Sequence, residues 1–298
     1  MLPVRLSFYC TTCLPGYHLP YLAAAATGLF AEFGFDVELL DPEGGPANVQ
    51  RVADGGADFC LTSVAHYLNA RARFGDLAAR FVAVVVQRSP MAALVAAASP
   101  IVDVADLAGR RLGGPAGGGM VLEYQAALDR LGLGPSELVD MDYRDAWTAL
   151  AEGRVDAVAD YVDIQPRLRR LAGIDVRAVP FGLALYSSGL VAADRLSHER
   201  VTDMRAALVA ALEAQRRAPE AGVDALVRRY PDIEPEAALE GWSLVEPYIF
   251  GDVPTGSMDP ERWADTVAFS ANAHGITAPD PESVYRPELA QLAAASTH

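Results

Sequence analysis

The chain has 298 residues, of which 51% are hydrophobic and 21% charged, a composition typical of a globular protein with a sizeable core. Its 39 acidic residues outnumber the 24 basic ones, and the formal net charge of −15 repels phosphate backbones, so nucleic acid is excluded as a partner. No apolar run reaches the roughly 18 residues that a membrane-spanning helix requires, so no integral membrane segment is predicted.

The N-terminal residues predict a strand over Val4–Tyr9 and not a secretory signal. They lack the charged region, apolar stretch and small-residue cleavage site that such a signal requires. As written, the chain is therefore expected in the cytoplasm. It would be periplasmic or extracellular if its true start lay upstream.

The three cysteines, Cys10, Cys13 and Cys60, are too few for a disulfide scaffold. Cys10 and Cys13 form a CxxC motif, but no second Cys or His pair lies at metal spacing, so no metal site is predicted. The two thiols are either small apolar residues at a strand end or, in a loop near a helix start, redox-active or nucleophilic groups.

The first part of the chain alternates strands with helices. A loop over residues 10–18 leads into a helix over 19–33, with Pro20 in its first turn. Strands over 36–40 and 58–61 flank a helix over 46–54, and Ser63 is placed as the N-cap of a helix that runs to Arg73. This order predicts a parallel sheet with crossover helices.

A second α/β unit follows. Strand-like runs over 81–87 and 92–97 lead to it, and a glycine-rich loop at 116–119 precedes a helix over 121–131. Strands over 138–141, 155–159 and 176–179 then alternate with helices over 144–152 and 165–171. The remainder is almost wholly helical, over 198–217, 220–229, 235–250 and 260–274.

The chain is expected to cross between the two units near 92–100 and again over 183–192. These crossings divide it into a first lobe of residues 1–95 and 190–298 and a second lobe of residues 96–189. The predicted fold class is therefore α/β, with two lobes, two hinge crossovers and a helical C-terminal part.

Three elements that follow strands are expected to meet in the cleft between the lobes, because ligands of open α/β sheets lie at the carboxyl ends of strands. They are the loop 10–18, the start of the helix over 63–73 and the glycine loop. The candidate ligand-binding residues on these elements and after the strand over 155–159 are Thr11, Thr12, Cys13, Tyr17, His18, Ser63, His66, Gly117, Gly118, Gly119, Asp160 and Asp163.

A structural role competes with the binding role of each candidate. His66 is either a core histidine or a neutral imidazole that hydrogen-bonds to the ligand. The glycine loop is either a flexible turn or a cradle of N–H groups for an anion. Asp160 and Asp163 either bind an amine or ring N–H of the ligand or cap a helix.

Several motifs resemble those of solute-binding proteins, in the branch for nitrate, sulfonates and aminopyrimidines that also includes the thiamin-pyrimidine synthases of yeast. The motifs are Gly16–Ala23, Gly28–Phe30, Gly34–Val37, Gly56–Phe59, Ala105–Gly113 and Glu152–Ala157. The resemblance implies a type II periplasmic-binding fold with a small molecule between two lobes. It also implies that aromatic groups of the loop with Tyr17 and His18 stack on the ligand.

The chain departs from the pyrimidine synthases at two places. Those enzymes carry pyridoxal phosphate on a lysine four residues before a histidine, and here Thr62 takes the place of that lysine while His66 keeps the histidine. They also bind iron through a run of cysteines, where this chain has Phe181–Tyr186. Neither cofactor is therefore expected.

The resemblance and the motifs favour a binding protein that closes its two lobes on a polar or anionic, partly aromatic metabolite and, if exported, delivers it to an ABC permease. The alternative is a cytosolic enzyme on the same fold, a lyase or desulfinase that uses Cys13 and His66 as nucleophile and base. A regulatory sensor is a third class, which would need a partner surface.

Overall fold

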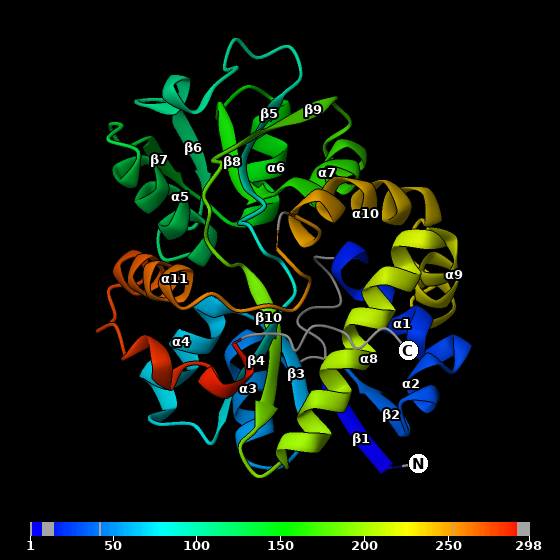
Figure 1. The fold of residues 1–298 in the computed structure, drawn as a ribbon. Helices are drawn as coiled ribbons and strands as arrows, with labels where there is room; N and C mark the ends of the chain where they lie inside the picture. Colours follow the sequence, from blue (N-terminus) through cyan, green and yellow to red (C-terminus); the bar gives the residue numbers. More distant parts are fainter. Residues whose placement is uncertain (1, 8–14, 42, 252, 291–298) are drawn as a thin grey trace.

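The computed structural model describes residues 2–7, 15–41, 43–251 and 253–290, and its strands form two five-stranded sheets (Figure 1). The first sheet has the order β2 (Phe35–Leu40), β1 (Leu2–Ser7), β3 (Phe59–Ser63), β10 (Ser188–Ala193), β4 (Ala79–Val84). The second has the order β7 (Glu137–Asp140), β6 (Arg111–Gly114), β8 (Ala157–Tyr161), β5 (Met91–Ala96), β9 (Val176–Pro180).

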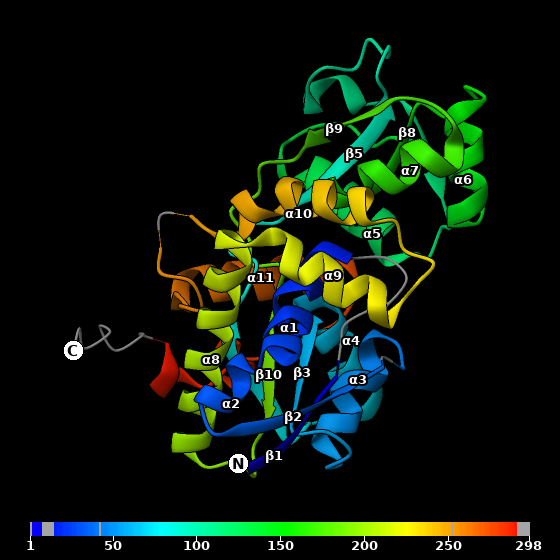
Figure 2. The same ribbon diagram turned by 90° about the vertical axis from the view of Figure 1, so that its right-hand side faces the viewer.

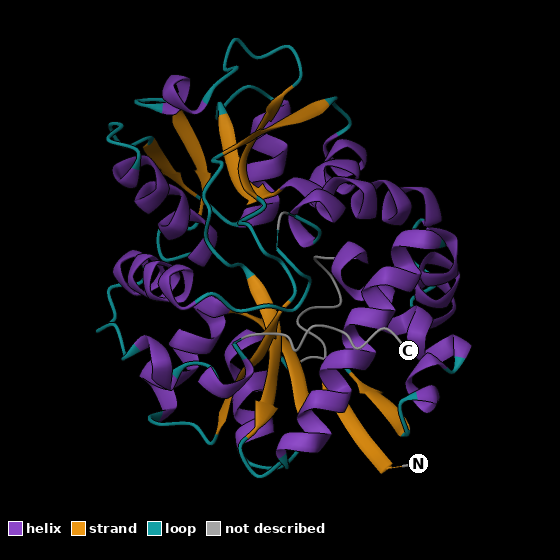
Figure 3. Cartoon of the chain, viewed as in Figure 1, coloured by secondary structure: helices purple, strands orange, loops and turns teal. Residues whose placement is uncertain are grey.

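Helices cover both sheets, as Figure 3 shows by colour. The α-helices are α1 (Pro15–Thr27), α2 (Leu29–Glu32), α3 (Gly45–Ala53), α4 (Val64–Phe74), α5 (Gly119–Arg130), α6 (Tyr143–Ala151), α7 (Gln165–Ala172), α8 (His198–Arg217), α9 (Pro219–Arg229), α10 (Pro235–Ile249) and α11 (Pro260–Ala273). Short 3₁₀ turns are η1 (Val104–Leu107), η2 (Val162–Ile164), η3 (Pro281–Ser283) and η4 (Pro287–Leu289). Among the described residues no helix is both long and apolar enough to cross a membrane.

Each sheet contains one antiparallel strand. β10 runs antiparallel to β3 and β4, and β5 runs antiparallel to β8 and β9, whereas β1 pairs in parallel with β2 and β3, and β6 with β7 and β8. β5 and β10 are also the strands that the chain enters on passing from one sheet to the other. The predicted α/β class with two crossovers is thus confirmed.

The two crossing segments, residues 85–90 and 181–187, run side by side. The Ser187 N–H donates to the Val86 carbonyl at 3.1 Å, and the Ser89 N–H to the Leu183 carbonyl at 3.3 Å. This pairing explains why the strand predicted over 183–192 begins only at Ser188: the residues before it bond to the other crossing. The predicted lobe boundary at 95/96 falls inside β5, which pairs in the second sheet, so we propose that the first crossing lies over residues 85–90.

One predicted helix, over 19–33, is two helices in the structure. Gly28 has a φ of 80°, a conformation that residues with a Cβ rarely adopt, and it separates α1 from α2. α1 also begins at Pro15, so Pro20 lies inside the helix and not in its first turn. The predicted first strand, Val4–Tyr9, begins earlier, at Leu2, and its described part ends at Ser7.

The C-terminal helices connect the two sheet layers. α8 and α9 pack on α1 beside the first sheet, α10 packs on α7 and η2 of the second, and α11 contacts both α4 and α5 (Figure 2). Trp263 of α11 stacks on Tyr285 at 5.4 Å between ring centroids and lies 5.0 Å from Phe81 of β4. The segment after α11 therefore belongs to the core beside the first sheet.

Candidate functional site

A small cavity lies between the two sheets, next to both crossing segments. Its walls come from the start of α4, the crossings, α5, the end of β8 and α11, through Ser63, Val64, Ala65, Ser89, Glu123, Tyr161, Leu185, Tyr186, Ser187, Phe269 and Ser270. Its volume of about 20 Å³ is near that needed for one water molecule. A metabolite therefore fits there only after side chains move or the two sheets separate.

The parallel strands β3 and β8, one from each sheet, end at the cavity wall. Ser63 is the last residue of β3 and the N-cap of α4, with its Oγ 3.1 Å from the His66 backbone N–H that it accepts from. Tyr161 is the last residue of β8. The predicted cap is thus confirmed, and Ser63 is the sequence-predicted binding residue that lines the cavity wall.

His66 lies one turn into α4 and packs against the backbone at the start of α3. A methyl group added at Gly45 would overlap the His66 ring, so the glycine allows the imidazole to lie there. Burial, together with the nearby His274, lowers the pKa of His66 to about 4. The imidazole is therefore neutral at physiological pH.

His274 and Glu123 form a contact that the sequence did not indicate. His274 Nε2 lies 3.3 Å from Glu123 Oε1 on α5, and its Nδ1 lies 3.4 Å from Asn69 Nδ2 on α4. Glu123 lines the cavity. His274 is 151 positions from Glu123 and 205 from Asn69 in the chain, so no local pattern could have paired them.

The glycine loop before α5 already uses several of its backbone N–H groups. Asp140 Oδ1 accepts from the Ala116 N–H at 2.9 Å, and the Pro115 carbonyl accepts from the Gly118 N–H at 2.8 Å. Fewer N–H groups are thus left for an anion than the glycines suggest. A methyl group at Gly118 would overlap Tyr143 and Pro115, so packing accounts for that glycine.

Asp160 lies in β8, next to its last residue, and Asp163 lies in η2, which follows β8 directly. Asp160 Oδ1 accepts from the Tyr161 N–H at 2.8 Å, and burial raises the pKa of this carboxyl to about 7. Asp163, in η2, is 4% exposed, and burial together with the Asp160 charge raises its pKa well above the usual range. Neither carboxylate caps a helix: the α7 N-cap is Ile164, without a side-chain cap bond.

Other sequence-predicted residues fall partly outside the described parts of the chain. Thr11, Thr12 and Cys13 lie outside the described residues, and so does the side chain of Tyr17. His18 in α1 is 1% exposed, and burial lowers its pKa to about 3. Cys60 is buried in β3, where burial raises the pKa of its thiol and so disfavours the reactive thiolate.

The amino-acid composition bears on whether a lysine could carry pyridoxal phosphate in this chain. All 24 basic residues are arginines, because the chain contains no lysine. A lysine-bound pyridoxal phosphate therefore cannot form at any position, beyond the replacement at Thr62. The described residues include no group of three His, Cys, Asp or Glu side chains that could hold a metal ion.

Solved structures with the same architecture include solute-binding proteins and an enzyme. The periplasmic aliphatic sulphonate-binding protein SsuA of Escherichia coli is 18% identical over 95% of this chain and 91% of its own, with a TM-score of 0.74. The alkanesulfonate-binding SsuA of Xanthomonas axonopodis pv. citri bound to MOPS is 18% identical over 95% and 96%, with a TM-score of 0.66. DSZB in complex with biphenyl-2-sulfinic acid is 18% identical over 97% of both chains, with a TM-score of 0.63.

These identities show the fold alone, which is that of the periplasmic binding proteins. No curated protein matches the chain. The model of the family described as NMT1/THI5 like matches residues 16–221, more than half of the chain. The chain therefore belongs to the NMT1/THI5-like family.

Proposed function

We propose that this protein binds a small polar solute between its two lobes and closes on it by a hinge motion at the crossing segments. The observation that carries the proposal is the cavity, whose walls come from both sheet layers and both crossings. Such a site is enclosed when the lobes approach and is opened when they separate. The sulphonate-binding proteins with the same fold support the same role here.

Contacts between the layers fit a closed form. Arg130 of α5 pairs with Asp265 of α11, and Arg169 of α7 pairs with Glu240 of α10. Both pairs are partly exposed, so each contributes little and breaks readily.

If the protein is exported, we propose an ABC permease as its partner, because one solved structure of this fold is the ligand-binding component of an ABC-type import system.

The test is a thermal-shift and small-angle scattering series with ethanesulfonate, nitrate, benzenesulfonate and 4-aminopyrimidine as probes. We expect at least one probe to raise Tm, with a smaller radius of gyration at saturation. A protein that none of these probes stabilises or compacts would contradict the proposal.

A desulfinase-like enzyme is the second candidate, because DSZB shares the architecture over nearly the whole chain and is described as a desulfurization enzyme. In this chain the nucleophile would be Cys13, with the neutral imidazole of His66 as the base. Cys13→Ser separates the two functions. A binding protein keeps its affinity within a few-fold, whereas an enzyme binds its substrate and loses turnover by orders of magnitude.

A further inference from the structure

The second crossing segment is bonded to α4 and α11 from Tyr186 onward. The Tyr186 N–H donates to Thr266 Oγ1 at 3.0 Å, and the Tyr186 hydroxyl accepts from the Asp259 N–H at 2.7 Å. The Ser187 carbonyl accepts from the Val64 N–H at the start of α4, at 3.0 Å. The backbone and the ring of Tyr186, a residue of the cavity wall, are therefore both held by the N-terminal half of α11 and its N-cap.

The residues just before Tyr186 are not held in this way. The backbone N–H groups of residues 182–185 donate to no described residue, whereas the Phe181 N–H donates to the Met91 carbonyl of β5 at 3.2 Å. Gly182 has a φ of 67°, a conformation that glycine adopts without strain. Backbone whose amides have no partner opens and turns most easily, so the second crossing is weakest between Phe181 and Tyr186.

Arg262, in the first turn of α11, contacts both crossings. Its guanidinium lies 5.3 Å from the centroid of the Tyr186 ring, a favourable place for a cation, and its Nη1 donates to the carbonyl of Gln87 in the first crossing at 3.2 Å. Gln87 is 1% exposed. Arg262 is not among the described residues that line the cavity, so it can act on a solute there only through Tyr186.

The backbone of Arg262 belongs to the same network. Its N–H donates to the carboxylate of Asp259, the N-cap of α11, at 2.8 Å, and its carbonyl accepts from the Thr266 hydroxyl at 2.7 Å. These are the two residues that bond to Tyr186. The side chain and the backbone of Arg262 therefore tie the two crossings to one helix turn.

α11 packs more firmly on the first sheet than on the second. Trp263, which follows Arg262, is fully buried, and its ring lies against Phe81 of β4 and stacks on Tyr285. The contacts of α11 with α5 are polar and include the half-exposed pair of Arg130 with Asp265. Buried aromatic contacts outlast exposed ion pairs, so α11 stays on the first sheet when the two layers separate.

We propose that Arg262 is a positioning residue of the solute site. By tying Tyr186 and Gln87 to α11, it confines the bending of the hinge to residues 181–185 of the second crossing and residues 88–90 of the first. This assignment rests on the proposed function. It adds to it the place at which each crossing bends and the residue that fixes that place.

The proposal divides the cavity wall between the lobes. Residues on α4, on α11 and after the bend in the second crossing keep their mutual positions on the first lobe, and form a half-site that exists before closure. The solute binds to this half-site first and meets the second lobe on closing. Ser63, Tyr186, Ser187 and Ser270 stay in the half-site, whereas Glu123 and Tyr161 move away with the second lobe.

The first test follows amide hydrogen exchange in the unliganded wild type, resolved to single residues by NMR. We expect the Tyr186 N–H to exchange at least about a hundredfold more slowly than the N–H groups of residues 182–185, because only the former donates to an acceptor in the described chain. Equal rates would show that α11 does not hold the second crossing, and would overturn the assignment.

The second test repeats the measurement in Arg262→Met, Arg262→Lys and Arg216→Met. Arg216 is the matched control, since its guanidinium lies 4.6 Å from the centroid of the Phe250 ring and pairs with Glu246, away from both crossings. We expect Tyr186 exchange to be about tenfold faster in Arg262→Met and unchanged in Arg216→Met. Arg262→Lys keeps a cation for the ring and a donor for the Gln87 carbonyl, and should stay within about threefold of the wild type.

Exchange of the β3 amides, at the centre of the first sheet, distinguishes positioning from a general loss of stability. We expect these amides to exchange at the wild-type rate in all three variants. Equal acceleration of β3 and Tyr186 in Arg262→Met, no acceleration at Tyr186, or an Arg262→Lys variant that behaves like Arg262→Met would each overturn the assignment. The measurement needs no solute, so its failure leaves the proposed function standing, whereas failure of every probe above to bind contradicts that function itself.

Discussion

Glu123 on α5 and His274 at the end of α11 lie 3.3 Å apart, Oε1 to Nε2, and so join the second sheet layer to the C-terminal helices at the wall of the cavity. The same two helices are joined again by Arg130, whose guanidinium makes two parallel bonds to the Asp265 carboxylate. α11 also packs on β4 of the first sheet through Trp263. Separation of the lobes must therefore break the contacts between α5 and α11.

Arg130→Ala is expected to favour the open form. Arg130 and Asp265 are 40% and 44% exposed, so the pair contributes about 0.2–1 kcal/mol. That is small against global stability but enough to shift an equilibrium between closed and open lobes. Small-angle scattering of the unliganded variant should give a larger radius of gyration. Arg154→Ala, which breaks a pair with Glu152 within the second lobe, is the control, and an equal radius in both variants would contradict the prediction.

Two neighbouring glycines should respond differently to the same change. A methyl group at Gly118 would overlap the Tyr143 hydroxyl and Pro115, whereas one at Gly117 meets no atom within 4 Å. Gly118→Ala is therefore expected to cost about 1–3 kcal/mol of unfolding free energy, and Gly117→Ala to stay within about 0.5 kcal/mol of the wild type. Urea unfolding measures both. Equal losses would mean that the loop requires glycine for its backbone and not for packing.

Stability in acid should depend on the buried histidines. The pKa of His66 is about 4 and that of His18 about 3 in the folded chain, while both are near 6.5 when unfolded. The unfolded state therefore binds more protons below pH 6.5, so stability is complete above that pH and is lost as pH falls toward 4 and 3. Asp160 acts in the opposite sense. The pKa of its carboxyl is about 7 in the folded chain and near 4 when unfolded, so its contribution to stability is lost as pH rises from 4 to 7.

The variant His66→Asn isolates the histidine contribution. It should lose less stability than the wild type between pH 7 and pH 4.5, by up to about 3 kcal/mol. His198→Asn, at an exposed position in α8, is the control and should follow the wild type. Urea midpoints across this range give the measurement, and parallel curves for His66→Asn and the wild type would show that the imidazole is not held neutral.

Local signals in the sequence predicted elements well but not their partners. The helix over 198–217 has the same limits in the structure, and Ser63 caps α4 as predicted. The strand over 92–97 was also predicted, yet its place in the second sheet depends on pairing with β8 and β9, which no local pattern encodes. Element type follows from periodicity, whereas sheet membership follows from contacts distant in the chain.

In the candidate site, too, local signals in the sequence identified residues but not the contacts that those residues make. Asp160 and Asp163 stood out because they follow a strand, but Asp163 lies in η2, which packs on α10 some 70 residues later, so its burial among the described residues was not predictable from the local sequence. The glycine loop suggested an anion site, and Asp140, which accepts from the Ala116 N–H of that loop, lies on a strand further along the chain.

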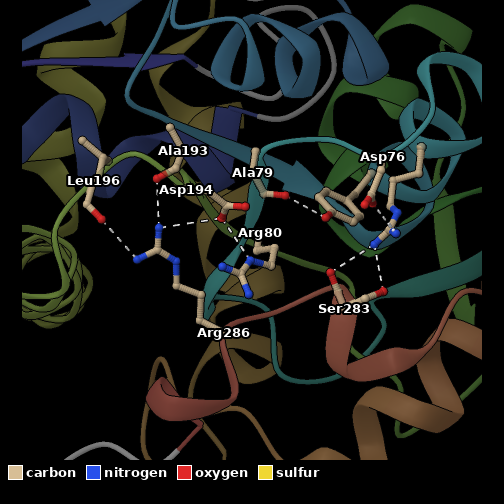
Figure 4. Close-up of polar contacts among 10 residues, drawn as sticks. Asp76, Ala79, Arg80, Ala193, Asp194, Leu196, Ser283 and Arg286 are labelled. Carbon is tan, nitrogen blue, oxygen red and sulfur yellow. Dashed lines mark hydrogen bonds and ion pairs between the residues drawn. The ribbon is translucent and has the colours of Figure 1, made fainter.

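The segment after α11 is expected to stabilise the first lobe through one buried arginine. Arg286 is 4% exposed and donates to the Ala193 carbonyl at 2.9 Å and the Leu196 carbonyl at 3.5 Å, beside Asp194, which also pairs with Arg80 (Figure 4). The backbone on either side of Tyr285 bonds to Phe81, so this segment covers the edge of β4.

Arg286→Met keeps an unbranched apolar stem and removes the donors, leaving the two carbonyls without this guanidinium. We expect a loss of about 2–4 kcal/mol of unfolding free energy, because buried acceptors lose their partner and Asp194 keeps Arg80 alone. Arg71→Met is the comparison at the other end of the segment: it removes bonds to Ser283 but also an exposed pair with Asp76, and should cost less. If Arg286→Met unfolds at the wild-type urea concentration, the segment contributes nothing to the first lobe through this residue.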